Sequence, residues 1–528
     1  MERVSLENGV MEMSLLEKGQ KGLLRALFGR TGIIVLLLLL QIALLVLFYQ
    51  RFSEYVPQLY TAMIVISICA VFYLLNNSID PSAKITWLII IIVFPVFGAL
   101  LLIYTQMDVG HRTLKKAVAR TIDSTRDSIP QDQKCMDELS AESPETASLA
   151  RYISRSGCYP VFQNTHVTYF PLGADKLMEL LNQLEKAEKF IFLEYFIIDE
   201  GLMWGSVLDI LARKARDGVE VRVMYDGSCE FSTLPHSYPK LLRDLGIQCK
   251  VFSPARPFLS THYNYRDHRK ILVIDGHTAF TGGINMADEY INHTVKYGHW
   301  KDTAIMLQGD AARSFTLMFL QLWNSYEKKP VYAKYLSAHT YPMAEANGYV
   351  IPYADCPLDD DKVGERVYMD ILNRAQNYVH IMSPYLILDG ELETALKYAA
   401  ERGVEVSLIL PGIPDKKIPY ALAKTHYPSL MASGVKIYEY TPGFVHAKVF
   451  VSDDCKAVVG TINMDYRSLY HHFECAAYLY KSDCIPTIEE DFQKTLTRCQ
   501  LVTRETLRKE PITRKLTGIV MKAIAPLM

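Results

Sequence analysis

The sequence lacks three features that would assign it to common protein classes. It has no excess of charge, because 56 lysine and arginine residues stand against 58 aspartate and glutamate residues, for a net charge of −2. Its ten cysteines form no C-x-x-C pair and no spacing typical of a metal site. Its first apolar region is too long for a signal peptide and lacks a small-residue cleavage site, so the sequence does not predict a signal peptide. The balanced charge argues against nucleic acid as the main partner, and the cysteines fit reduced thiols better than a disulfide framework.

Long apolar runs are present near the N-terminus. The first of them spans about 27 Å as a helix, which is close to the thickness of a bilayer core. Pro95 and Gly98 interrupt the third run, which leaves open whether two or three segments cross a membrane. The expected membrane segments lie at about residues 31–50, 60–76 and 85–104.

Basic residues flank these runs and bear on orientation. If three segments cross, the nearby lysines and arginines divide evenly between the two sides. If two cross, both basic flanks lie on one side, which the positive-inside rule makes cytoplasmic. We therefore expect a multi-pass protein of the cell membrane whose region beyond these segments is cytoplasmic.

The rest of the chain indicates a duplicated α/β fold. A length of 528 residues is too great for one ordinary core. Beyond residue 150, buried strands alternate with amphipathic helices, and the same order occurs twice. The expected parts are a polar arm at 1–30, transmembrane segments within 31–104, a linker at 105–150, two α/β halves at 151–335 and 336–510, and an amphipathic helix at 511–528.

The C-terminal stretch carries an apolar stripe at helical spacing. Its members are Leu516, Ile519, Val520, Ala523, Ile524 and Leu527. Lys515 and Lys522 lie off that stripe. The pattern fits a helix on a membrane surface and equally a helix that packs on the protein.

One motif occurs once in each half. Each copy reads H-x-K-x4-D and is followed, after the same gap, by G-x-I-N-M, with every matched position offset by 178 residues. An in-register repeat of this kind indicates a duplicated fold. The matched residues are His268, Lys270, Asp275 and Asn285 in the first half, and His446, Lys448, Asp453 and Asn463 in the second.

The residue types of this motif suit phosphoryl chemistry. Apolar, β-branched residues follow each histidine and predict a buried strand, on which the histidine and the lysine two residues later share a face. Lysines stabilise charge on the non-bridging oxygens of a phosphate. One imidazole can attack while the other protonates the leaving oxygen, and each asparagine can donate an amide hydrogen bond. The pair therefore predicts one site that acts on a phosphodiester without a metal or another cofactor.

The two motifs resemble the paired HKD motifs of the phospholipase D superfamily. Three longer strings resemble bacterial cardiolipin synthases in particular, and the resemblance runs from about Val167 to Tyr480 and includes the N-terminal membrane segment. Those strings are Asn264–Gly276, Asp288–Tyr290 and Pro442–Lys448. The resemblance implies a pseudo-twofold pair of α/β halves with the active site at their interface.

The resemblance also implies roles for individual residues. One histidine forms a covalent phosphatidyl-histidine and the other acts as acid and then base. We assign His268 as the nucleophile and His446 as the acid and base, while the reverse assignment stays open. A carboxylate downstream of each motif orients the histidines, and the matching positions are Asp302 and Glu474. We expect Asp275 and Asp453, which complete the catalytic motifs, to support the site rather than touch substrate.

One position departs from the family pattern. His471-His472 stands where the family usually has an asparagine just before Phe-Glu, which puts a local contact in doubt.

The expected function is that of a cardiolipin synthase, in which two phosphatidylglycerol molecules give cardiolipin and glycerol. The expected partners are phosphatidylglycerol, other membrane lipids and the membrane, with no nucleic acid. A phospholipase D-type hydrolase, a transferase with another acceptor such as phosphatidylethanolamine, and a catalytically inactive membrane scaffold are the alternatives. The membrane segments weaken the first of these, and two complete motifs argue against the last.

Overall fold

The computed structural model describes residues 36–527 except 37–38, 45, 48–55, 78–79, 107–108, 255–264, 326, 337–345 and 360. The chain forms two compact units. The first unit holds the residues up to Arg112, and the second, which carries both motifs, begins at Thr113. The expected arm at 1–30 and most of the expected segment at 31–50 lie outside the described residues.

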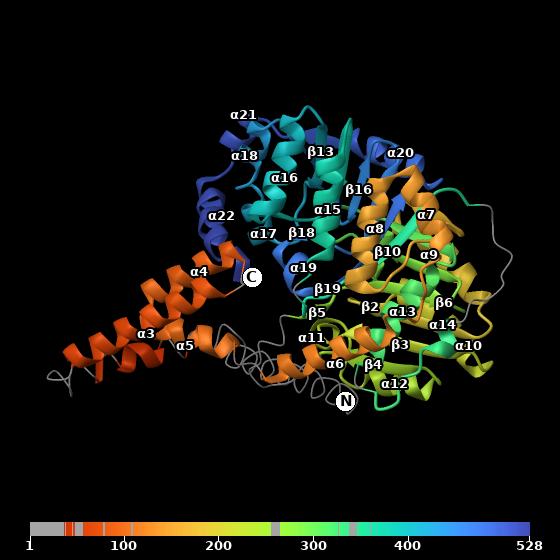
Figure 1. Cartoon of the computed structure of the whole chain (residues 1–528), viewed down its shortest axis with the longest axis horizontal. Helices are drawn as coiled ribbons and strands as arrows, with labels where there is room; N and C mark the ends of the chain where they lie inside the picture. Colours follow the sequence, from red (N-terminus) through yellow and green to blue (C-terminus); the bar gives the residue numbers. More distant parts are fainter. Residues whose placement is uncertain are drawn as a thin grey trace, which may run out of the picture. The chain divides into compact units, whose positions relative to one another are not determined.

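Among the described residues from Val56 onward, the N-terminal unit contains three apolar helices, drawn in red and orange in Figure 1. They are α3 (Val56–Asn76), α4 (Pro81–Val93) and α5 (Pro95–Gln106). Asp80 caps α4 by accepting hydrogen bonds from two backbone N–H groups of its first turn. Pro95 separates α4 from α5, because proline lacks the N–H group that a continuous helix needs. The expected segment at 85–104 is therefore two short helices rather than one.

Among the helices that the structure describes, none combines the length and the apolar character needed to cross a bilayer. α4 has 13 residues and α5 has 12, each well short of the roughly 20 that a span requires.

The stretch expected to be a linker, 105–150, is largely helical. It forms α6 (Val109–Thr125), α7 (Gln133–Glu142) and the first half of α8 (Pro144–Gly157). Its polar residues mislead because apolar residues recur among them at helical spacing, and Leu139, Ala147 and Ile153 are buried in a core shared with the second half. This prediction was wrong for that reason, and the catalytic unit begins well before residue 151.

The first half contains a seven-stranded mixed sheet in the order β1-β9-β7-β6-β2-β3-β4. Its strands are β1 (Thr165–Phe170), β2 (Phe190–Tyr195), β3 (Glu220–Asp226), β4 (Gln248–Phe252), β6 (Lys270–Ile274), β7 (Thr278–Gly282) and β9 (Ala304–Gly309). Its helices are α9 (Gly173–Glu185), α10 (Leu202–Arg216), α11 (Cys229–Ser232), α12 (Tyr238–Asp244), α13 (Ala312–Trp323) and α14 (Ala333–Leu336), with a 3-10 turn, η3, at Asp288–Ile291.

The second half repeats this strand order as β10-β19-β17-β16-β11-β13-β14 and adds β20 at the edge. Its strands are β10 (Tyr349–Asp355), β11 (Tyr378–Met382), β13 (Glu405–Pro411), β14 (Lys436–Tyr440), β16 (Val449–Ser452), β17 (Lys456–Gly460), β19 (His472–Tyr480) and β20 (Cys499–Leu501). Its helices are α15 (Val363–Arg374), α16 (Gly390–Glu401), α17 (Lys417–Ala423), α18 (Tyr427–Ala432), α19 (Tyr466–Tyr470), α20 (Ile485–Leu496), α21 (Arg504–Arg508) and α22 (Ile512–Ile524), followed by the 3-10 turn η4 (Ala525–Leu527). The duplicated α/β fold predicted from the repeat is present.

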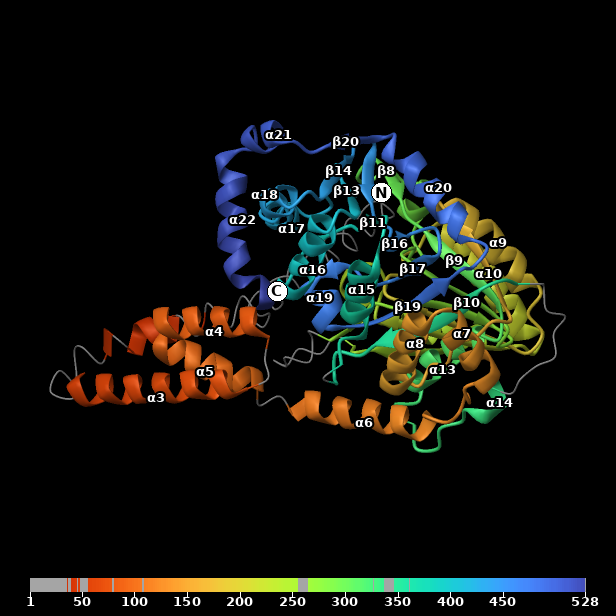
Figure 2. The same ribbon diagram turned by 45° about the horizontal axis from the view of Figure 1, so that its top comes forward.

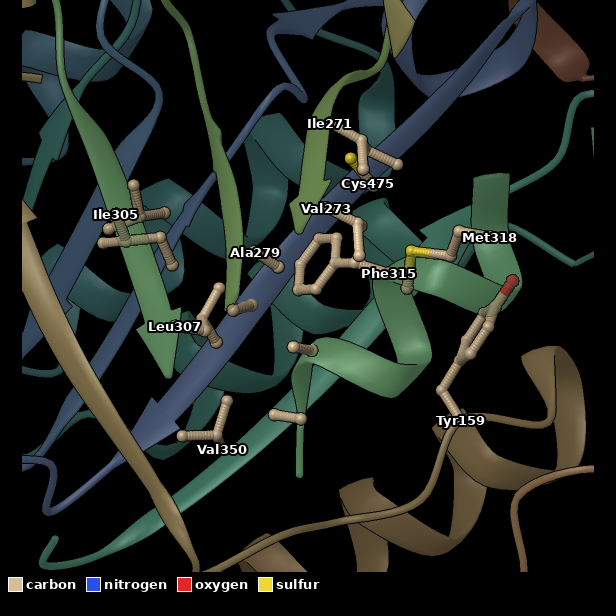
Figure 3. Close-up of a cluster of buried hydrophobic side chains, with 14 of the residues drawn as sticks. Tyr159, Ile271, Val273, Ala279, Ile305, Leu307, Phe315, Met318, Val350 and Cys475 are labelled. Atoms are coloured by element: carbon tan, nitrogen blue, oxygen red, sulfur yellow. The ribbon is translucent and has the colours of Figure 1, made fainter. Parts of the chain in front are cut away.

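A continuous core joins the two halves. α13 is buried along its whole length and contacts β6 and β7 of the first sheet and β10 of the second. Figure 3 shows Phe315 and Met318 of α13 beside Val273 of β6, with Val350 of β10 and Cys475 of β19 in the same cluster. Because nearly all side chains of α13 are buried, this helix lies in the interior between packed layers, where Thr316 and Gln321 form hydrogen bonds.

Short strands cross between the halves. β5 (Arg266–Asp267), just before the first motif, pairs in parallel with the start of β19. β15 (Gly443–Val445), just before the second motif, pairs in parallel with β8 (His299–Lys301) of the first half. A further two-residue pair joins β12 (Leu386–Ile387) to β18 (Met464–Asp465). The first two crossings bring each motif histidine beside a strand of the other half.

The C-terminal helix α22 packs on α17, as Figure 2 shows. The sequence had left open whether this helix packs on the protein or lies on a membrane. The structure establishes a packing contact, which occupies only one face of the helix.

Candidate active site

Both motifs lie at the start of a buried strand. Lys270 begins β6 and Lys448 immediately precedes β16, and these strands are buried throughout, as their apolar, β-branched residues predict. The two histidines and two lysines are themselves almost fully buried. Four basic side chains in the interior need specific partners, since unpaired lysine is rarely buried.

His268 of the first half is oriented by the second half. Its Nδ1 lies 2.8 Å from Oε1 of Glu474, a residue of β19. Its backbone N–H donates to the carbonyl of Phe473 at 3.0 Å, which fixes the main chain beside the same strand. The hydroxyl of Thr461 also donates to Glu474. The carboxylate is thereby held from two sides.

His446 of the second half has the reciprocal arrangement. Its Nδ1 lies 2.7 Å from Oδ2 of Asp302, which follows β8 of the first half. Its backbone N–H donates to the carbonyl of Lys301 at 2.7 Å. The carboxylate downstream of each motif therefore serves the histidine of the other half. The sequence identified both carboxylates but not this exchange, because β5 and β15 are too short to leave a periodic pattern.

Burial keeps both imidazoles neutral. It lowers the pKa of His446 to about 4, with Lys448 acting in the same direction and Asp302 opposing. Burial also lowers the pKa of His268 well below its usual value, against the opposing charge of Glu474. The pKa of Glu474 is held below its usual range, because the favourable effect of His268 outweighs burial. Each carboxylate is thus charged and can accept the Nδ1–H of its histidine.

The two lysines have pKa values close to neutral pH. Burial lowers the pKa of Lys270 to about 8 and that of Lys448 to about 7, although Glu474 and Asp302 favour the charged forms. Lys270 donates to the carbonyl of His268 at 2.6 Å, and Lys448 donates to that of His446. An anion between the motifs would favour the charged ammonium groups and raise both pKa values.

Aromatic rings enclose the imidazoles. Phe196 packs edge-on against His268 with ring centroids 4.8 Å apart. Tyr290, Trp300 and Phe444 surround His446 at centroid distances between 5.4 and 5.9 Å. These rings shield the imidazoles of His268 and His446 from water. They thereby contribute to the burial that lowers the pKa values of both histidines.

The two motif aspartates lie at the far ends of their strands. Asp275 is five residues beyond Lys270, about 16 Å along β6, and accepts hydrogen bonds from the backbone N–H groups of residues 188, 189 and 190. Asp453 does the same for residues 376, 377 and 378. Both have a left-handed backbone with φ of 52°. Each aspartate therefore anchors the strand next to its motif strand.

The motif asparagines differ from each other. Asn285 accepts from the backbone N–H of Ile197 at 3.1 Å and donates to the hydroxyl of Tyr290 at 2.7 Å. Asn463 is buried, and its Oδ1 has no hydrogen-bond partner among the described residues. Asn285 thus positions Tyr290 beside His446, whereas the Oδ1 of Asn463 is unpaired within the described residues.

The glycine-rich turns differ in the same way. A side chain at Gly283 would overlap the carboxylate of Asp302. Thr461 holds the matching position in the second half and donates to Glu474. The smaller residue, Gly283, thus lies beside Asp302, and Thr461 lies beside Glu474.

His472 is an addition that the sequence flagged only as a departure from the family pattern. It is buried, its ring centroid lies 5.3 Å from that of His268, and its Nδ1 lies 3.7 Å from Glu474. His268, His472 and Glu474 place their possible ligand atoms within 4.8 Å of one another, a set that fits a transition metal. A second such group, of carboxylates alone, consists of Glu365, Asp389 and Glu391.

Comparisons with known proteins bear on the family and the fold of this chain. A family model described as cardiolipin synthase, PLD-like domain, matches residues 180–323 and 368–496. A model described as phospholipase D-nuclease N-terminal matches residues 65–103. The crystal structure of phosphatidylserine synthase from Haemophilus influenzae is similar with a TM-score of 0.55 at 15% identity, covering 72% of this chain and 98% of that one. That likeness concerns the fold alone.

Relatives in sequence cover most of the chain. An uncharacterised protein of Streptococcus mutans is 58% identical over 87% of this chain and 99% of its own length. Cardiolipin synthases of Alkalihalophilus pseudofirmus and Geobacillus kaustophilus are each 32% identical over 85% of this chain and 89% of their own length. With two complete motifs, exchanged carboxylates and these matches, the chain belongs to the cardiolipin synthase family of phospholipase D-like proteins.

Proposed function

We infer that the protein is a cardiolipin synthase that transfers a phosphatidyl group from one phosphatidylglycerol molecule to a second and releases glycerol. The observation that carries this inference is the pair of buried imidazoles, each oriented by a carboxylate of the other half and each accompanied by a lysine. Such a site can run a displacement at phosphorus in two steps, because it offers a nucleophile and a separate proton carrier.

In the first step, His268 attacks phosphorus. A carboxylate can only accept, so Glu474 fixes the proton of His268 on Nδ1 and leaves the lone pair on Nε2. A P–N bond forms and the P–O bond to glycerol breaks. His446 gives its Nε2 proton to the departing glycerol oxygen. Asp302 stabilises the protonated form of His446 that this requires, and the bound phosphodiester anion raises its pKa from about 4.

In the second step, the hydroxyl of the second phosphatidylglycerol attacks phosphorus. His446, now neutral, takes the hydroxyl proton, the new P–O bond forms, and the P–N bond to His268 breaks. The pair is then restored. Lys270 and Lys448 stabilise the charge that grows on the non-bridging oxygens in both steps, and the amide NH2 group of Asn463 is a donor of the kind that can serve the same oxygens.

A direct experiment separates this reaction from its alternatives. Purified protein is incubated with labelled phosphatidylglycerol, and the lipid products are identified by mass spectrometry. Glycerol release with a four-chain lipid supports the synthase. Phosphatidic acid as the main product would support a hydrolase, and a mixed lipid formed when phosphatidylethanolamine is added would support a broader acceptor range. His268→Ala is the control for contaminating activity.

We also propose that the N-terminal unit associates with a membrane and keeps the catalytic unit on the cytoplasmic side. The exposed apolar side chains of α3, including Ile64, Val65 and Phe72, support this proposal, since lipid would cover them. The proposal is checked by alkaline extraction of membranes and by protease treatment of intact spheroplasts. Release of the chain by alkali, or cleavage of the catalytic unit from outside, would contradict it.

A further inference from the structure

α22 contacts the catalytic unit through one face only. Gly518 faces α17, and any side chain there would overlap the carbonyl oxygen of Ala421. The guanidinium of Arg514 lies over the ring of Tyr420 at 5.3 Å. Just before the helix, Glu510 forms an ion pair with Lys424 at 3.0 Å. These contacts fix the rotation of α22 about its own axis.

The opposite face of α22 is apolar and exposed. At 100° per residue, Ile512, Leu516 and Ile519 lie within about 60° of one another and point about 150° away from the face formed by Arg514 and Gly518. Their exposed fractions are 74%, 58% and 64%. Val520, at the edge of the same stripe, is 63% exposed. A helix that packs only on its own protein would turn this stripe toward the protein. In the observed orientation the stripe faces away from the protein, which indicates that lipid or another molecule covers it.

The charged residues of α22 itself are all basic. α22 contains no acidic residue, and Lys515 and Lys522 are exposed beside the stripe. On the neighbouring α17, Lys417 and Ile418 are exposed as well. An apolar stripe bordered by lysines is complementary to a bilayer surface with anionic headgroups, where the lysine stems extend to the phosphates.

We propose that α22 lies in the interfacial region of an anionic lipid bilayer, with Ile512, Leu516, Ile519 and Val520 inserted among the acyl chains, and docks the catalytic unit on the membrane. A second copy of the chain fits less well, because two such faces would bring lysines against lysines. The proposal draws on the proposed function for its choice of lipid, since phosphatidylglycerol is anionic and enters from a bilayer.

The contacts of α22 also lead toward the second motif. Ala525, at the end of the helix, packs with Leu422 of α17 and Tyr466 of α19. α19 forms the connection from Asn463 to β19, the strand that carries Glu474. Docking through α22 thus places the element between these two site residues close to the lipid surface.

The first experiment locates lipid contacts in the full-length protein. A photo-reactive benzoylphenylalanine replaces Ile519 or, as the matched control, Thr517, which lies off the stripe, and the protein is reconstituted in vesicles of phosphatidylethanolamine and phosphatidylglycerol. Irradiation should give lipid adducts at position 519, and several times fewer at 517. Equal adducts at both positions, no lipid adduct at 519, or cross-links at 519 to a second copy would each overturn the proposal.

The second experiment asks whether docking matters for turnover. Leu516→Asp/Ile519→Asp should lower cardiolipin formation on vesicles by about tenfold or more, because each buried leucine-sized side chain contributes about tenfold in partitioning. The same variant should act normally on a short-chain, monomeric phosphatidylglycerol, and Thr517→Asp should act normally on both. Equal loss on both substrates would show a structural role and overturn the proposal. If the wild type forms no four-chain lipid from either substrate, the proposed function fails, while the cross-linking result still decides the position of α22.

Discussion

Glu474 and Asp302 determine what the two histidines can do. Each carboxylate fixes one proton position and favours the charged form of an imidazole that burial keeps neutral. The distances of 2.8 Å and 2.7 Å from carboxylate oxygen to Nδ1 are those of charge-assisted hydrogen bonds. We therefore expect the two residues to act together with the histidines as one unit, although each comes from the opposite half.

Glu474→Gln tests this directly. Glutamine keeps the size of the side chain but not its charge, and it can present an N–H group to His268. Turnover should fall by a factor of about 10² or more, as for loss of a general acid or base. Because the two residues act as a unit, His268→Ala/Glu474→Gln should be no slower than His268→Ala alone. Rates should be compared for variants whose circular dichroism spectra match that of the wild type, and additive losses in the double variant would contradict the assignment.

The lysine pKa values give a second prediction at this scale. At pH 8, Lys448, with a pKa of about 7, is mostly neutral, and Lys270, with a pKa of about 8, is half protonated. A tetrahedral anion raises both pKa values, so binding must take up protons, on the order of one per site. Calorimetry of sulfate binding in buffers of different ionisation enthalpy measures this number.

The matched variant is Lys448→Met, which should take up fewer protons at the same pH. The difference in uptake between the wild type and Lys448→Met should shrink at pH 6, where both lysines already carry their protons. Zero uptake at pH 8 in the wild type would mean that the lysines are fully charged in the free enzyme.

The residues of the site were largely predictable, but their pairing was not. The repeat of His, Lys and Asn identified every motif residue, because a strand places alternate side chains on one face. The exchange of Asp302 and Glu474 depends on β5 and β15, which have two and three residues. Segments so short have no periodicity, and only the three-dimensional packing of the halves selects their partners.

At the scale of secondary-structure elements, the motif strands begin at the site and end in an anchor. The carboxylate of Asp275 gathers three N–H groups at the start of β2, one of them on the buried Phe190. Asp453 gathers three N–H groups at the start of β11, where those of Gln376 and Asn377 are exposed. The same hydrogen-bonding arrangement therefore occurs in a more buried environment at Asp275 and in a more exposed one at Asp453.

Unequal losses of stability follow from this difference. Asp275→Ala leaves a buried N–H group without a partner and should cost about 3 kcal/mol of unfolding free energy or more. Asp453→Ala should cost less, because water replaces the lost bonds. Asp275→Asn should be the mildest change at that position, since asparagine retains an oxygen acceptor and tolerates a φ of 52°. Urea unfolding of the catalytic unit measures the unfolding free energy of the three variants. If Asp453→Ala lost as much unfolding free energy as Asp275→Ala, the role of burial would be contradicted.

The elements also show where composition misleads. The polar stretch 105–150 indicated a linker, yet α7 and α8 contribute Leu139, Ala147 and Ile153 to a core with the second half. The apolar run 85–104 was expected to be a membrane segment interrupted at Pro95 and Gly98, and the structure divides it at Pro95 into α4 and α5. Average polarity is thus a weaker guide than the spacing of the few apolar residues and the position of proline.

At the scale of the whole molecule, the two duplicated halves form one candidate site, to which they contribute different residues. The two motifs match in sequence, yet Thr461 faces Glu474 while Gly283 leaves room for Asp302. His472 lies beside His268. Asn285 is engaged by Tyr290, and the Oδ1 of Asn463 has no partner among the described residues. These differences allow the two histidines to take different parts in one reaction.

The assignment of those parts is testable by trapping the covalent intermediate. His446→Ala keeps His268 as a nucleophile but removes the group that protonates the first leaving oxygen and deprotonates the acceptor. With glycerol as the leaving group, the first step should slow strongly. With an activated phosphatidyl donor, whose leaving group needs no proton, the first step should proceed and the second should not, so the adduct should accumulate. Because phosphohistidine is acid-labile, the reaction is analysed at neutral or alkaline pH, and peptide mass spectrometry should place the added mass on His268. An adduct on His446 in His268→Ala, with none on His268 in the reciprocal variant, would reverse the two roles, and no adduct in either would favour a direct displacement.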